Sequence, residues 1–120
     1  MEAHQALVAH LELTITDTVY AGRNEPPDTH QPSNPCVVLK RRDDGFTYDD
    51  DHAVPSFQVK CYAETEVDAL NLYEAVKTAI HHQTSQFMKY GELEGGGNIL
   101  HEQTDWPYVL AYFGVMLTLE

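Results

Sequence analysis

Long apolar runs, cysteines and positive charges are all scarce in this chain of 120 residues. No stretch approaches the ~20 consecutive apolar residues that a membrane-spanning helix needs. The N-terminus carries neither the basic nor the apolar region of a signal peptide. Two cysteines, Cys36 and Cys61, are too few for a disulfide scaffold, and we expect both to be buried free thiols. The sequence therefore predicts a protein with no membrane partner, made and used in a reducing cytoplasm.

The charge balance is strongly acidic. Only 7 Lys and Arg residues stand against 19 Asp and Glu residues, which gives a formal net charge of -12. Such a surface repels nucleic acids and anionic membranes, so we do not expect a DNA- or RNA-binding module. A protein past which DNA slides without binding is compatible with this charge. The length and the 42% hydrophobic content suit one domain, residues 1–120, with a core of its own.

The sequence also lacks the patterns of catalytic and metal sites. His81 and His82 are adjacent, so on a helix they would diverge by about 100° and could not easily share one ion. Asp49–Asp51 lack the spacing of a calcium-binding loop, and Gly95–Gly97 belong to no phosphate-binding motif. No Gly-x-Ser-x-Gly motif marks a nucleophile. We therefore expect no enzymatic activity, no cofactor and no metal.

The stretch from Ser56 to Ile80 predicts a strand, a tight corner and an amphipathic helix. In Ser56–Tyr62 apolar and polar residues alternate, as in a strand with one buried face. Thr65 is placed as an N-cap, three residues before Asp68. The helix that follows has a regular apolar face, formed by Ala69, Leu72, Tyr73, Val76, Ala79 and Ile80.

The N-terminal third is less regular. Apolar positions predict a helix to about His10 followed by extended chain, although Leu11–Tyr20 also alternates as a strand does. The proline-rich segment Asn24–Pro35 is expected to be a stiff loop. Cys36–Lys40 then predicts a strand, because it is apolar and β-branched.

A turn is expected at Asp43-Asp44-Gly45, with Phe46–Tyr48 beginning the return strand of a hairpin. Near the C-terminus, Thr84–Tyr90 is ambiguous, and Gly91–Gly97 predicts a flexible or sharply turning segment. Asn98–Thr104 is expected to be a strand, and Trp106-Pro107 marks a corner. The final strand, Tyr108–Glu120, should bury one face formed by Val109, Ala111, Phe113, Val115, Leu117 and Leu119.

These elements contain no repeated β-α-β pattern. They predict an α+β fold, in which a long helix packs on one face of a mainly antiparallel sheet and a short helix lies at the N-terminus.

A set of segments, in order, carries a resemblance to a known family. These are Val19-Tyr20 before the proline-rich loop, Pro35–Leu39, Ser56–Ala63, the helix Asp68–Val76, Asp105-Trp106-Pro107 and the closing strand through Phe113-Gly114-Val115. In this pattern, which covers about Val19–Leu119, the chain resembles the tail terminator proteins of tailed phages, also called tail completion or head-tail joining proteins. The family often has a longer N-terminal helix than residues 1–10 supply here.

The resemblance implies a structural subunit of the virion. Such subunits form a ring, a hexamer in this family, at the head-proximal end of the tail tube, after assembly in the host cytoplasm. The ring ends tube polymerisation and provides the surface to which head-completion or connector proteins dock. The implied partners are further copies of the chain, the tail tube protein and a connector, while DNA passes through the channel without specific binding.

Two other functions remain open. The chain could be another phage head-closure or connector protein of similar size, or a small-molecule-binding or enzymatic α+β domain that uses its histidines. For a ring protein, the segment around the expected turn brings opposite charges close together. We expect it to be an assembly surface formed by Arg41, Arg42, Asp43, Asp44, Asp49, Asp50 and Asp51.

Overall fold

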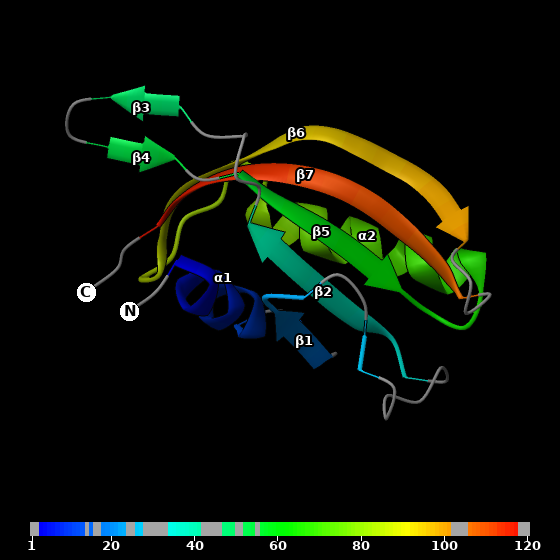
Figure 1. The fold of residues 1–120 in the computed structure, drawn as a ribbon. Coiled ribbons are helices and arrows are strands. Elements are labelled where there is room, and N and C mark those ends of the chain that lie inside the picture. The colour runs from blue at the N-terminus through cyan, green and yellow to red at the C-terminus, as the bar shows by residue number, and fades with distance from the viewer. Residues whose placement is uncertain are drawn as a thin grey trace.

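The computed structural model describes residues 3–13, 15, 18–23, 26–27, 34–41, 47–49, 52–54, 56–101 and 106–117. Within these residues, two helices and seven strands follow one another (Figure 1). They are α1 (Ala3–Glu12), β1 (Thr18–Ala21), β2 (Cys36–Arg41), β3 (Thr47–Asp49), β4 (His52–Val54), β5 (Ser56–Tyr62), α2 (Glu66–Ile80), β6 (Met88–His101) and β7 (Pro107–Leu117).

Five of the strands form one sheet in the order β1-β2-β5-β7-β6, and β3 and β4 form a separate two-stranded sheet. β1 runs parallel to β2, and every other neighbouring pair is antiparallel. The predicted α+β fold with a mainly antiparallel sheet is therefore confirmed.

Both helices pack on the same face of this sheet. The main core joins Leu7 and Leu11 of α1 and the buried face of α2 to alternate residues of the strands, among them Val59 and Phe113. These side chains are fully buried or nearly so, and we call this side of the sheet the helix face. No described helix covers the other side, which we call the open face.

The central strand, corner and helix are confirmed. The Thr65 side chain accepts a hydrogen bond from the Asp68 N–H at 3.2 Å, which satisfies one of the donors that a helix N-terminus leaves unpaired. The six residues predicted to form the apolar face of this helix are its buried residues. Pattern and structure agree here because one stripe of the helix covers the sheet and the rest meets solvent.

The N-terminal segment forms a helix that continues to Glu12, two residues beyond the predicted end. The alternative of a strand over Leu11–Tyr20 is wrong for its first residues, because Leu11 lies in α1 and is fully buried in the helix-face core. A strand does form at Thr18–Ala21, and it adds to the sheet parallel to β2.

The hairpin predicted between Cys36–Lys40 and Phe46–Tyr48 is wrong. β2 instead pairs with β5 over six residue pairs, and Thr47–Asp49 pairs with His52–Val54 over three. The longer pairing places Val37 and Leu39 in the helix-face core beside Val59, so burial of the whole strand outweighs the local turn signal. Figure 1 shows β3 and β4 projecting from the end of the sheet where β2 ends and β5 begins.

The prediction of a flexible or sharply turning segment at Gly91–Gly97 is also wrong. These residues lie inside β6, which has 14 residues and pairs with β7 along its length, with register shifts at three points. A Cβ on Gly91 would lie 2.5 Å from the carbonyl oxygen of Ile80, and one on Gly96 would lie 2.4 Å from that of Leu110. These two glycines therefore allow close packing inside the sheet and against α2.

The last strand is confirmed, and it runs from Pro107 to Leu117. Val109, Ala111, Phe113 and Val115 are fully buried on the helix face, and Leu117 packs against them while partly exposed. Leu119, the last residue expected on this face, lies outside the described residues. Among the described helices, neither is long and apolar enough to cross a membrane.

Candidate assembly surface

The open face of the sheet is a candidate site because no described helix covers it, and several of its side chains meet solvent. It carries the residues that alternate with the core positions of each strand, such as Lys40 of β2, Gln58 of β5 and Tyr112 of β7. These three residues are direct neighbours across the sheet, and each is half-buried or exposed. The face is therefore a polar and aromatic surface that spans the sheet.

One end of the open face is an aromatic cluster. The ring of Tyr62 stacks on that of Tyr108 with centroids 4.9 Å apart, and the indole of Trp106 meets Tyr62 edge-on at 6.2 Å. The ammonium of Lys60 lies 5.1 Å from the centroid of the Tyr108 ring, within range of a cation–π interaction. Tyr62 and Tyr108 form a second and smaller core together with Cys36 and Val38 of the neighbouring strand β2, and this core stiffens this end of the sheet.

At the other end, a side chain bridges three strands. The Ser56 hydroxyl on β5 donates a hydrogen bond to the carboxylate of Glu94 on β6. β7 lies between these strands, and its residue there is Gly114, which pairs with Ser56. A Cβ on Gly114 would lie 3.1 Å from Glu94 Oε2, so the glycine gives the carboxylate room to cross over the strand.

The predicted assembly segment begins beside this bridge. Arg41 is exposed at the end of β2, and Asp49 is the last residue of β3, paired with His52. Arg42, Asp43, Asp44, Asp50 and Asp51 lie outside the described residues. Residues 42–55, which we call the arm, contain one arginine and five aspartates, so their formal charge is 1 - 5 = -4.

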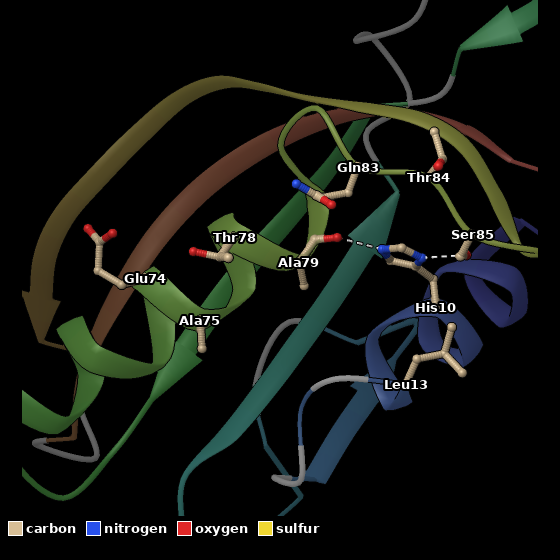
Figure 2. Close-up of a pocket in the computed structure, with 9 residues that line it drawn as sticks. All are labelled: His10, Leu13, Glu74, Ala75, Thr78, Ala79, Gln83, Thr84 and Ser85. Atoms are coloured by element: carbon tan, nitrogen blue, oxygen red, sulfur yellow. Dashed lines mark hydrogen bonds between the residues drawn. The ribbon is translucent and has the colours of Figure 1, made fainter.

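A groove on the opposite side of the molecule is the other candidate site. It has a volume of about 570 Å³ and lies between α1, the C-terminal half of α2 and the segment that follows α2. Figure 2 shows its lining residues, which are His10, Leu13, Glu74, Ala75, Thr78, Ala79, Gln83, Thr84 and Ser85. Short and mostly uncharged side chains dominate this list.

His10 is the buried titratable group of the groove, and both of its ring nitrogens are engaged (Figure 2). Nε2 donates to the Ala79 carbonyl oxygen at 2.6 Å, and Nδ1 lies 2.7 Å from Ser85 Oγ. Since Ser85 Oγ accepts from the Phe87 N–H at 3.1 Å, its own proton can point to Nδ1. The buried imidazole therefore ties α1 to the end of α2.

The two adjacent histidines also act within the fold. Their rings stack at 3.7 Å, and His81 Nδ1 accepts from the Leu93 N–H of β6 at 3.0 Å. His82 has a φ of 58° and donates its own N–H to the Gly91 carbonyl oxygen at 2.8 Å. These contacts cover the outer edge of the first half of β6, where an unpaired strand would otherwise be exposed.

The two thiols are buried, and burial also changes the pKa values of Cys61 and Tyr73. Cys36 and Cys61 are buried and free, as predicted. Burial raises the pKa of the Cys61 thiol, and the neighbouring Cys36 adds to this. The pKa of Tyr73 is also raised, chiefly by burial and further by the Glu74 carboxylate and Cys61. Among the residues with described positions, no three His, Cys, Asp or Glu side chains gather as they would around a metal ion.

Sequence reasoning singled out the charged segment at 41–51 and missed the open face. The signal was present in the alternation of β5, whose second face holds Gln58 and Lys60, but a strand pattern cannot say whether a helix covers that face. The bridge from Ser56 to Glu94 joins residues 38 positions apart, so it depends on the strand order and no local motif encodes it.

Comparison with known proteins gives a likeness of fold. No protein-family model matches the chain, and no curated protein matches it in sequence. Among solved structures, it resembles a chain from the virion of a native gene transfer agent particle, with a TM-score of 0.56 and 15% sequence identity. The match covers 96% of this chain and 90% of that one, so the two share the fold over nearly their whole lengths.

Proposed function

We propose that this protein is a structural subunit of a phage-like virion and acts as a tail terminator. As a single domain, it forms a ring, a hexamer as in the family it resembles, on the head-proximal end of the tail tube. The ring stops tube growth and offers a docking surface to a head-completion or connector protein. Its net charge of -12 suits a channel through which DNA passes without binding.

The observation that carries this proposal is the fold likeness to a virion chain over nearly the whole of both chains. It is independent of the order of sequence segments that resembles the tail terminators, since it rests on backbone geometry. The two together favour a role in particle assembly over a small-molecule-binding or enzymatic one.

The surfaces of the chain agree with a ring. A head-to-tail interface that closes on itself leaves no free end, which is how one small subunit can cap a tube without further growth. The open face and the projecting arm supply contact surfaces outside the main core. Within the arm, we assign subunit or partner contacts to Arg42, Asp43, Asp44, Asp49, Asp50 and Asp51, with Arg41 at its base.

Electron microscopy and genetics test this function. The purified protein should be monomeric or weakly associated alone, because ordering loops on assembly opposes binding. Mixed with tail tubes, it should form closed rings at one tube end. A phage or particle that lacks the gene should make tails of abnormal length that fail to join heads. Normal tails and normal infectivity from that mutant would contradict the proposal.

The runner-up is a head-closure or connector protein, which would bind the head vertex and leave tail length unchanged in the deletion mutant. The engagement of both His10 nitrogens disfavours a small-molecule or enzymatic role that would use this imidazole as a base or ligand. Specific metal or metabolite binding by the purified protein would support that role instead.

A further inference from the structure

Two charged side chains of opposite sign lie on the open face near opposite margins of the sheet. Lys40 is near the end of β2, one residue past the part of β2 that pairs with β1. Glu92 lies on β6, the strand at the other margin. Both side chains are exposed, and neither has an ion-pair partner among the described residues.

The two residues share a face. Lys40 alternates with the core residue Leu39, and Glu92 with Leu93, which packs on the same core. Lys40 and Glu92 also lie at nearly the same position along the strand direction. Lys40 lies in the row Lys40–Gln58–Tyr112, and Glu92 lies in the adjoining row Ser56–Gly114–Glu92. Adjoining rows on one face are two residues apart, or roughly 7 Å.

Within one chain the two charges are too far apart to pair. Three strand spacings separate β2 from β6, which is roughly 14 Å, and Gln58 and Tyr112 stand between. A head-to-tail ring can be built so that the β6 margin of one subunit faces the β2 margin of the next. Opposite charges at nearly the same level then meet across the interface, which is the complementarity that sets register and orientation between partners.

We propose that Lys40 of one copy pairs with Glu92 of the next, so that the partner of this surface is a second copy of the chain in head-to-tail contact. The inference rests on the ring proposed above. The acidic margin also holds Glu94, but its carboxylate is engaged by Ser56, which leaves Glu92 as the group that can reach outward. The pair is exposed at the rim, so it selects the correct register more than it supplies affinity.

Charge reversal tests the pair. K40E and E92K should each raise the protein concentration needed for ring formation on tube ends by at least about tenfold, because like charges then face each other. The double variant K40E/E92K should recover most of this loss, and its rings should again weaken with added salt. Matched controls are K77E and E74K on α2, which change the net charge equally and should have little effect.

Cross-linking tests the direction of the contact. The native thiols are buried, so a K40C/E92C chain assembled on tail tubes and treated with a short bismaleimide should give a series of covalent oligomers that ends at the ring size. K40C alone and E92C alone should stay monomeric, and their mixture should give dimers only. Dimers from either single variant would show a symmetric contact and overturn the proposal.

The two levels of the proposal fail separately. Rings of normal size from K40E and E92K, with no cross-linked series, would overturn the Lys40–Glu92 contact and leave the ring in place. A wild-type chain that forms no oligomer with or without tail tubes would overturn both.

Discussion

The Ser56 hydroxyl and the Glu94 carboxylate are hydrogen-bonded across an intervening strand, above the bare backbone of Gly114. Ser56 is fully buried, while Glu94 is otherwise exposed. The contact fastens the β6 margin to the central strand at the point where the arm joins the sheet. The hydrogen bond therefore links the start of β5, where the arm ends, to β6, the strand whose edge we assign to subunit contact.

Removal of this acceptor should destabilise the fold. Glu94→Ala leaves a buried hydroxyl without its partner, and we expect a loss of about 1–3 kcal/mol in the free energy of unfolding. Glu94→Gln is the matched control, because its amide oxygen can still accept the bond and should retain most of the stability. Urea denaturation measures both. An unchanged midpoint for Glu94→Ala would show that the bridge contributes nothing.

Three neighbouring glycines should respond differently to alanine. Gly95→Ala should be neutral or raise stability by about 0.4–1 kcal/mol, since its Cβ meets nothing within 4 Å and its backbone is not left-handed. Gly96→Ala should destabilise by more than that amount, because φ is 99° and the Cβ would collide with Leu110 and Ala111. Gly97→Ala carries the same φ penalty with a milder contact against Tyr73. Thermal unfolding of the three variants gives the order, and equal melting temperatures would contradict it.

The contrast between these glycines shows where sequence reasoning stops. In α2 the period of apolar residues and the capping Thr65 are local signals that agree with the tertiary structure, so the helix and its buried face are predictable. At Gly95–Gly97 the local signal is flexibility, whereas the structure needs Gly96 to approach β7 and Gly97 to approach α2. Such a need depends on which strand lies alongside, and the composition of a segment does not contain that information.

The partner of β2 shows the same limit. Asp43-Asp44-Gly45 is a sound turn signal, but the choice between a short local hairpin and the longer β2–β5 pairing depends on burial of whole strands. For the candidate site, charge alone pointed to residues 41–51. The open face required knowledge of which side of the sheet both helices cover.

Stability should fall in alkaline solution because of Cys61. Burial keeps the folded-state pKa of this thiol above its ordinary value of about 9. Above pH 9 the unfolded chain loses the proton while the folded chain keeps it, so the free energy of unfolding decreases by up to about 1.4 kcal/mol per pH unit. Below pH 9 both states hold the proton and the thiol adds no slope.

Urea titrations at pH 8, 9 and 10 measure this dependence. A Cys61→Ala variant is less stable at every pH because it leaves a cavity, but its slope between pH 9 and 10 should be flatter. The raised pKa of Tyr73 adds a further decline only above about pH 10, and because Cys61 contributes to that shift the two slopes are compared between pH 9 and 10. Parallel curves for the two proteins would show that Cys61 ionises as readily in the folded state as in the unfolded one.

The arm should be dispensable for folding and required for assembly. β3 and β4 pair only with each other in the described part of the sheets, and β2 and β5 are antiparallel neighbours up to the pair Arg41 and Phe57. In a variant with residues 43–55 replaced by Asn-Gly, continuation of the same register would pair residue 42 with Ser56 across a two-residue Asn-Gly turn, a length and sequence that antiparallel strands favour. This variant also removes all five aspartates of the arm.

We expect the shortened chain to fold with a near-normal circular dichroism spectrum and a cooperative melt, while failing to form rings on tail tubes. A full-length control with Asn at positions 49, 50 and 51 separates charge from shape, because it keeps the arm and removes three of its charges. If the control also fails, and wild-type rings weaken with salt as exposed ion pairs do, the arm acts through its aspartates. If the shortened chain caps tubes as well as wild type does, the arm is a solvent-exposed connection between β2 and β5 with no role in assembly.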